Sequence, residues 1–151
     1  MRIERRLTEP GRSPYGAIPF RESGSEIRNP DGSVVFALER FQVPAHWSQV
    51  ASDILAQKYF RKAGVPAKLK RIEDAVPSWL WRSVPDTDAL ALLPEGERFA
   101  SETDARQVFA RLAGTWTYWG GHGGYFTSEE DASALFDELR YMLAMHMGAP
   151  H

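Results

Sequence analysis

Apolar side chains in residues 46–63 recur with the spacing of one helical face. The matching positions stand at i, i+3, i+4, i+7, i+8 and i+12, and they are Trp47, Val50, Ala51, Ile54, Leu55 and Tyr59. Gly64 and then Pro66 follow, as is typical of the C-terminal end of a helix. The pattern therefore predicts an amphipathic helix over residues 46–63.

Two further helices are predicted in the second half of the chain. Ser101, with Asp104 three residues on, forms a weaker variant of the capping box, and Thr127 with Glu130 forms a full one. The apolar face of the first is Ala105, Val108, Phe109, Leu112, Trp116 and Trp119, and that of the second is Ala132, Leu135, Phe136, Leu139, Met142 and Leu143. The glycine-rich residues 120–124 end the first helix, and Gly148 and Pro150 are expected to close the second.

The first half of the chain is rich in proline and glycine. We expect residues 1–25 to be an extended arm whose anchors are Tyr15, Ile18 and Phe20. Residues 29–32 read Asn-Pro-Asp-Gly and predict a turn between two strands, since proline presets φ and glycine accepts a positive φ. Four prolines break up residues 66–100, where short helices are predicted at 78–83 and 86–93.

These elements predict a mainly α fold. Three amphipathic helices cover one another, accompanied by a small β-hairpin and the extended N-terminal arm. We expect two regions, the arm over residues 1–25 and a single mainly helical domain over residues 26–151.

Composition narrows the class of protein. The 151 residues fit one domain, and the net charge of −2 provides no general attraction for nucleic acid or an anionic membrane. No apolar stretch is long enough to span a bilayer, so a soluble cytoplasmic protein without DNA or membrane partners is expected. The chain has no cysteine, which excludes disulfides, cysteine-ligated metals and a thiyl radical on this sequence.

A basic run is the best local candidate for contact with phosphate or with an acidic partner. It comprises Lys58, Arg61, Lys62, Lys68, Lys70 and Arg71. Lys58, Arg61 and Lys62 are the residues for which we predict such a contact. The more ordinary explanation is a solvated helix end that Glu73 and Asp74 neutralise.

An aromatic cluster is a candidate docking face for a partner. Its members are Trp116, Tyr118, Trp119, Tyr125 and Phe126. Basic residues are not interleaved with these rings, so a core or an interface is favoured over stacking on nucleic-acid bases. The glycine-rich residues 120–124 match neither the G-x-G-x-x-G motif nor the Walker A motif of phosphate-binding loops. The four histidines lack the spacing of a metal site.

Long stretches of the chain resemble a known family. They are residues 43–66 (VPAHWSQVASDILAQKYFRKAGVP), 99–109, 112–119 (LAGTWTYW), 124–132 and 136–143, together with residues 1–6 and 25–36. These strings are similar to the N-terminal region of proteobacterial adenosylcobalamin-dependent (class II) ribonucleoside-diphosphate reductases. The resemblance covers essentially the whole chain.

The resemblance implies a non-catalytic N-terminal domain that packs on the catalytic barrel of a reductase. Enzymes of this family convert ribonucleotides to deoxyribonucleotides for DNA synthesis, using adenosylcobalamin and a cysteine thiyl radical. The family's Ser-Pro-x-x-Phe-Asn type segment, which begins the barrel, has no counterpart after residue 147. We therefore expect no catalytic residue, no cofactor and no activity on this chain alone.

Two other functions remain open from the sequence. One is a free-standing regulatory protein that binds a reductase or a nucleotide in trans. The other is a nucleotide-binding module that uses the basic run.

Overall fold

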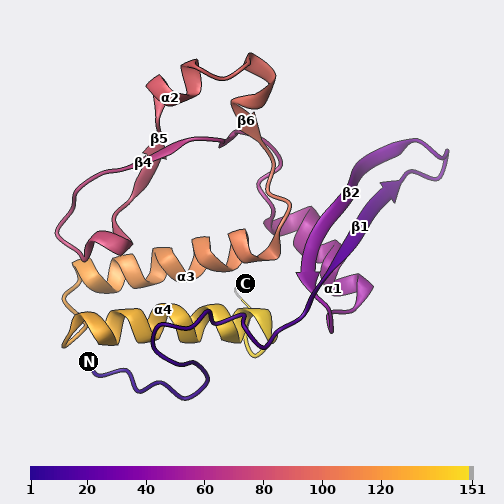
Figure 1. Cartoon of the computed structure of the whole chain (residues 1–151). Coiled ribbons are helices and arrows are strands. Elements are labelled where there is room, and N and C mark those ends of the chain that lie inside the picture. The colour runs from indigo at the N-terminus through magenta and orange to yellow at the C-terminus, as the bar shows by residue number, and fades with distance from the viewer. Residues whose placement is uncertain (150–151) are drawn as a thin grey trace.

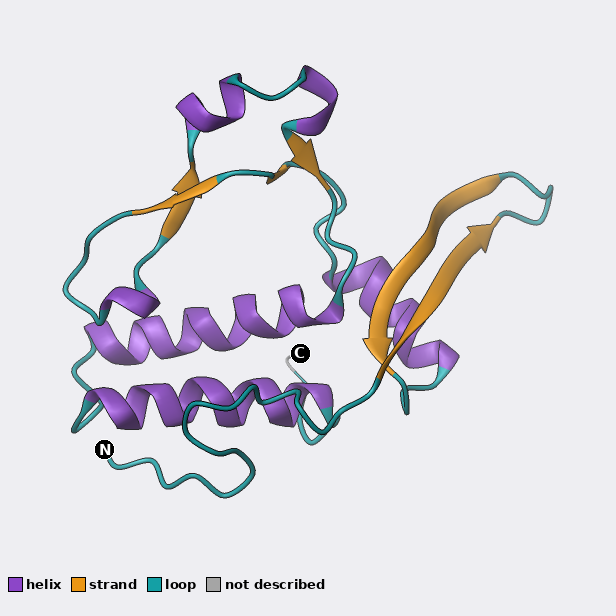
Figure 2. Ribbon diagram, viewed as in Figure 1, coloured by secondary structure: helices purple, strands orange, loops and turns teal. Residues whose placement is uncertain are grey.

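The computed structural model describes residues 1–149. Two helices, α3 (Ala105–His122) and α4 (Glu129–Ala144), lie side by side at the centre (Figure 1). A ribbon of two strands projects from one end of this pair, and residues 65–100, here called the excursion, arch over α3 (Figure 2). The N-terminal residues 1–19, here called the arm, run along α4.

Local capping sets where the two long helices begin. Asp104 caps α3 and forms a reciprocal capping box with Gln107, so the helix begins three residues later than Ser101 suggested. Ser128, one residue after the predicted cap, accepts a hydrogen bond from the amide of Asp131 and opens α4. Three acidic residues in the first turn of α4 suit the positive end of the helix dipole.

The helix predicted over residues 46–63 is shorter at both ends. It consists of α1 (Gln49–Ile54), capped by Ser48, and a π-helical turn (Leu55–Tyr59). Phe60 is already extended, because its ring turns inward and packs edge-on against Phe41 at 5.5 Å. Packing of this aromatic pair therefore ends the helix before Gly64 does.

The ribbon pairs β1 (Phe20–Arg28) with β2 (Val34–Pro44) in antiparallel register, from Phe20 opposite Pro44 to Arg28 opposite Val34. The turn predicted at residues 29–32 is present, with Gly32 at a φ of 87°. The register shifts between Ser23 and Ser25, where a Cβ on Gly24 would lie 2.8 Å from the carbonyl oxygen of Glu39. Glycine is needed there because the two backbones approach too closely for any side chain.

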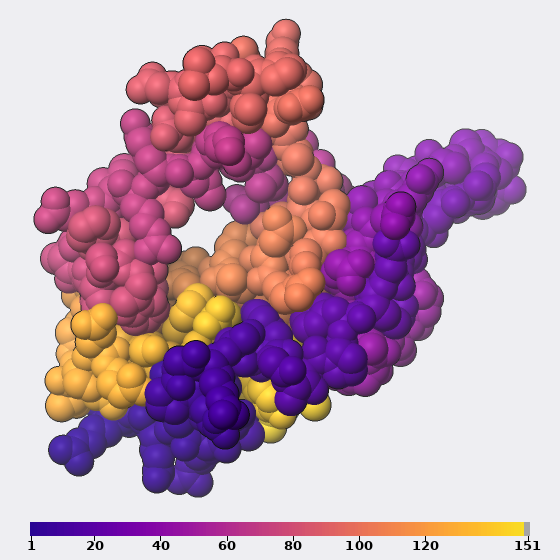
Figure 3. Space-filling model, in the orientation of Figure 1, coloured from indigo at the N-terminus to yellow at the C-terminus, as the bar shows by residue number. Residues whose placement is uncertain are grey.

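The excursion contains two more small antiparallel sheets. In one, β3 (Val65–Pro66) pairs with β6 (Phe99–Ala100), and in the other β4 (Leu69–Arg71) pairs with β5 (Ser83–Pro85). It also holds α2 (Thr87–Ala91) and two 3₁₀ turns, Ser78–Leu80 and Glu95–Glu97. Figure 3 shows an opening between the excursion and α3, so much of this segment does not pack on the helix pair.

The prediction of a mainly α fold with three helices and one hairpin is wrong. The described chain is 38% helical and 21% strand, with four α-helices and three two-stranded antiparallel sheets. The strands of the excursion are two or three residues long, too short for an alternating pattern to reveal them. Residues 20–25 of the expected arm belong to β1, since pairing with β2 fixes them.

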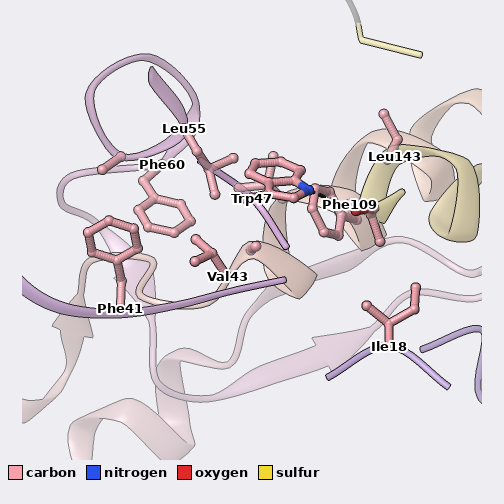
Figure 4. Close-up of a cluster of buried hydrophobic side chains, with 12 residues drawn as sticks. Ile18, Phe41, Val43, Trp47, Leu55, Phe60, Phe109 and Leu143 are labelled. Atoms are coloured by element: carbon pink, nitrogen blue, oxygen red, sulfur yellow. Dashed lines mark hydrogen bonds between the residues drawn. The ribbon is translucent and has the colours of Figure 1, made fainter. Parts of the chain in front are cut away.

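The core lies where the ribbon, α1, α3 and α4 meet. Figure 4 shows its larger side chains in a continuous row from β2 through the π-helical turn to α4. The labelled members are Ile18, Phe41, Val43, Trp47, Leu55, Phe60, Phe109 and Leu143. Trp47 joins the two halves of the row, with its ring 5.7 Å from that of Phe109 and its Nε1 donating to the carbonyl of Ala144 at 2.8 Å.

Within residues 1–149, no helix has the length and apolar character needed to cross a membrane. The helix stop predicted at Pro150 lies outside the described residues, as does His151, whereas α4 ends at Ala144.

Candidate functional site

A buried carboxylate joins the end of the π-helical turn to the start of α3. Glu102 is fully buried and accepts hydrogen bonds at 2.9 Å from the backbone amide and the Nε of Arg61. Arg111 donates to both carboxylate oxygens, at 2.9 and 3.2 Å, and also to the carbonyl of Tyr59. Burial raises the pKa of Glu102, but the hydrogen bonds and charges of the two arginines outweigh burial and leave the pKa below its ordinary value.

This arginine–glutamate cluster, Arg61, Glu102 and Arg111, accounts for one of the three predicted contact residues. Arg61 faces the cluster, although half of its side chain stays exposed. Lys62 lies over the ring of Phe36 with Nζ 4.7 Å from the centroid. Lys58 is exposed at the end of the π-helical turn, and its side chain has no hydrogen bond or ion pair within residues 1–149. The three cations therefore lie in different surroundings.

The arm is held by acidic side chains on one face of α4. The N-terminal amine donates to the carbonyl of Tyr125, and the amide of Ile3 donates to Asp131 at 2.8 Å. Glu138 accepts from the amides of Leu7 and Thr8 and, at 2.6 Å, from the Thr8 hydroxyl. Burial raises the pKa of Glu138, but these donors outweigh it and lower the pKa overall.

Arg5 completes the attachment of the arm. Its guanidinium is 10% exposed and pairs with Asp137 at 2.7 Å and with Glu130 at 2.8 Å. The arm is therefore an ordered part of the domain and covers the acidic side of α4.

The five aromatic side chains of the predicted docking face differ in burial and in the elements that they contact. Trp116 is half-buried beside α4, and Phe126 is half-buried against Gly120. Trp119 and Tyr125 are each 63% exposed. Tyr118 faces the excursion, so the structure does not bring all five rings onto one surface.

Tyr118 belongs to a polar cluster that ties the excursion to α3. Its hydroxyl donates to Asp74 Oδ2 at 2.5 Å, and His122 Nε2 lies 3.1 Å from Oδ1 of the same carboxylate. Arg82 Nε lies 3.5 Å from Asp74 Oδ2. The Tyr118 hydrogen bond, with the Ala75 amide and His122, lowers the pKa of Asp74 to about 2.

An apolar groove opens between α1, α3 and α4. Its main pocket has a volume of about 240 Å³ and is lined by side chains that include Ile54, Leu112 and Leu143. A second pocket of about 220 Å³ adjoins it over Trp116, Leu139 and Met142, and the two share Leu143, Gly148 and Ala149. Most of these apolar positions lie on the predicted helix faces, which were expected to cover one another and here leave a groove between them.

The end of α4 turns back beside this groove. His146 has a φ of 57° and stacks on Trp47 with ring centroids 4.0 Å apart. Burial, and secondarily the nearby His46, lower the pKa of His146, which favours the neutral ring. No signal in the sequence indicated this stack, since Trp47 and His146 are far apart along the chain. The described residues contain no group of three or more His, Asp or Glu side chains arranged to hold a metal ion.

The domain is formed by the arm, the ribbon, the excursion, α1 and the helix pair, and it presents an open apolar groove. The sequence profile of class II vitamin B12-dependent ribonucleotide reductases matches residues 21–146. The chain therefore belongs to this family, as its N-terminal domain, and the family resemblance seen in the sequence is confirmed.

The relatives agree with this assignment. The vitamin B12-dependent ribonucleotide reductase of Bradyrhizobium diazoefficiens is 69% identical over the whole chain, and that of Agrobacterium fabrum is 66% identical over the whole chain. The reductase of Streptomyces coelicolor is 28% identical over 95% of the chain. The chain spans 12% of the length of each of these three relatives.

Proposed function

We propose that this domain packs on the catalytic part of a vitamin B12-dependent ribonucleotide reductase and supports it structurally. The whole enzyme would reduce ribonucleotides to deoxyribonucleotides in the cytoplasm. The observation that carries the proposal is the match of the whole chain to two reductases at 69% and 66% identity. The open apolar groove supports it, because apolar surface of this kind marks sites of association.

Adenosylcobalamin is the cofactor we propose for the whole enzyme. The groove on this domain is a poor fit for it, since neither of its two pockets, of about 240 and 220 Å³, reaches the roughly 300–1,000 Å³ of ordinary small-molecule pockets, and a corrinoid is larger still. The groove is also apolar, whereas a corrinoid carries many amide side chains. We therefore assign no residue of this chain to cofactor binding.

A contact of Lys58, Arg61 and Lys62 with phosphate or an acidic partner stays a prediction. Lys58 is the freest of the three, since Arg61 pairs with Glu102 and Lys62 lies over Phe36. The aromatic docking face also stays a prediction, with Trp119 and Tyr125 as its most exposed members. A free-standing regulatory protein gains no comparable support, because the relatives that match are reductases of which this chain spans 12%.

Reconstitution tests the proposal. A full-length reductase that carries this domain is compared with a version that lacks residues 1–149, to which the separate chain is added back. We expect adenosylcobalamin-dependent reduction to fall on deletion and to recover when the chain is added. The control is a Val43→Asp chain, which cannot keep its core because Val43 is fully buried. If deletion leaves the rate unchanged and the added chain does not bind, the proposal is wrong.

A further inference from the structure

The apolar groove is a part of the domain that its own fold leaves uncovered. α1 and the π-helical turn form one wall, α3 the floor, and the end of α4 the other wall. Ile54 on the rim is 50% exposed although its neighbour Leu55 is buried. Keeping such a surface in water is unfavourable, since burial of apolar area is the main driving force of association.

The described part of the chain ends at this groove. The bond from Trp47 Nε1 to the Ala144 carbonyl holds the last turn of α4, and the amide of Met147 closes the turn on the Met142 carbonyl at 2.9 Å. His146 stacks on Trp47 and reverses the chain. Gly148 and Ala149, the last described residues, consequently line both pockets of the groove.

From this geometry we propose that the groove is the seat of the polypeptide that follows residue 151 in the full-length reductase, and that this segment fills it with apolar side chains. The inference rests on the proposed function, in which the domain is continuous with a catalytic part. The lining of the groove is mainly apolar, with Tyr59 and His146 as its polar side chains, which selects an apolar occupant over a charged one.

Tethering favours this occupant over a second copy of the chain or a separate protein. A segment that starts at the mouth of the groove has an effective concentration on the order of millimolar, whereas a free partner must bind from dilute solution. The short distance along the chain also limits the entropy lost when the segment docks.

Photo-crosslinking tests which polypeptide lies in the groove. A benzoylphenylalanine replaces Ile54 in the full-length reductase, and a control carries it at Val50, which is on the same helix, is 67% exposed and does not line the groove. We expect the probe at position 54 to join to residues shortly after 151 of the same chain, and the probe at 50 not to do so. Three results would each overturn the proposal: crosslinks to a second copy of the chain, crosslinks only to distant parts of the catalytic region, or no crosslinking above the control.

A pair of charge substitutions gives an independent measurement. Ile54→Glu and Val50→Glu both place a carboxylate on exposed positions of α1, so neither should change the thermal midpoint of the separate chain. In the full-length reductase, we expect Ile54→Glu to speed proteolytic cleavage just after residue 151 by about tenfold, equivalent to ~1.4 kcal/mol of docking energy, and Val50→Glu to leave it unchanged. Equal cleavage in the two variants would overturn the proposal.

These outcomes are separate from those of the reconstitution. A domain that binds the catalytic part through another surface would restore reduction when added back, and yet Ile54→Glu would behave like Val50→Glu. That combination would leave the proposed function standing and remove the groove as the seat of the following segment.

Discussion

Glu102 shows how one side chain holds two distant segments together. Its carboxylate is fully buried, yet two arginines and one backbone amide satisfy it. The side chain of Arg61 is 52% exposed and that of Arg111 33%, so water reaches the positive side of the cluster. A buried charge of this kind stabilises the fold only while its partners are present, since an unpaired one is strongly unfavourable.

Glu102→Gln should therefore destabilise the domain. The amide is similar in size but removes the charge and puts an NH₂ group near the two arginines, so we expect the free energy of unfolding to fall by about 3 kcal/mol. Urea denaturation followed by tryptophan fluorescence measures the change. Glu73→Gln, at an exposed carboxylate, is the control and should have no effect. An equal midpoint for both variants would contradict this account of the cluster.

Asp74 gives a prediction for pH dependence. Its pKa is lowered from 3.8 to about 2, first of all by the Tyr118 hydroxyl. Because the folded pKa lies below the unfolded one, the stabilisation is complete above about pH 4. It is lost as the pH falls toward about 2 and the folded carboxylate takes up a proton.

Tyr118→Phe should raise the pKa of Asp74 toward its ordinary value, because the largest cause of the shift is removed. An NMR titration of the side-chain carboxyl carbons measures it. Asp31, whose pKa is lowered by Ser33, is an internal control that should not change. An unchanged Asp74 titration in the variant would show that the hydroxyl is not the cause.

At the scale of elements, the arm and α4 form one unit although they are at opposite ends of the chain. The N-terminal amine bonds to Tyr125, just before α4. Bonds from Ile3, Arg5, Leu7 and Thr8 then follow α4 from its first turn to Glu138. Residues 1–8 of the arm are thus ordered by charge and hydrogen bonds, whereas Tyr15 and Ile18 further along the arm pack on the hydrophobic core. The acidic side chains of α4 therefore do more than suit the positive end of the helix dipole, because they bind the arm.

Glu138→Ala should release the middle of the arm. Three donors, the amides of Leu7 and Thr8 and the Thr8 hydroxyl, lose their acceptor. Hydrogen bonds to a charged group contribute about 1.5–3 kcal/mol, so the exchange of these two amides with deuterium should speed up by at least about tenfold. Glu9→Ala, at an exposed carboxylate that pairs only with Arg12 among the described residues, is the control. Unchanged exchange at residues 7 and 8 would show that the arm is held in another way.

At the scale of the whole molecule, the excursion is the part least connected to the core. It is attached at both ends by the β3–β6 pair and at its middle by the Asp74 cluster and the bond from Trp79 Nε1 to Glu129. The opening beneath it in Figure 3 agrees with an element that folds mostly on itself. The core of ribbon, α1, α3 and α4 is therefore expected to fold without it.

Replacement of residues 68–97 by a short Gly-Ser turn tests this expectation. The flanking positions are already joined by a bond from the Ala67 amide to the Arg98 carbonyl at 3.0 Å, so a short link fits. We expect cooperative unfolding to persist, with a loss of about 2–4 kcal/mol from the exposure of apolar groups under Leu80. Differential scanning calorimetry measures both quantities. A broad, non-cooperative transition would show that the excursion is essential to the core.

The sequence by itself predicted the elements that neighbouring residues determine. Apolar periodicity and capping residues located α3 and α4 to within a few residues, and Pro30 and Gly32 located the turn of the ribbon. The family could also be identified from the sequence, because long strings of uncommon residues were retained along the whole chain.

Contacts between residues far apart in the sequence determined the small sheets, the order of the arm and the groove. The strands of the excursion form because segments 12 to 35 residues apart in the sequence pair with each other, and no alternating pattern within two or three residues can reveal such pairing. The arm is ordered by a helix more than 120 residues away, and Glu102 is buried by arginines on two other segments. The groove likewise depends on where α1 and the end of α4 come to rest, since a helix face that packs and one that stays open have the same apolar pattern.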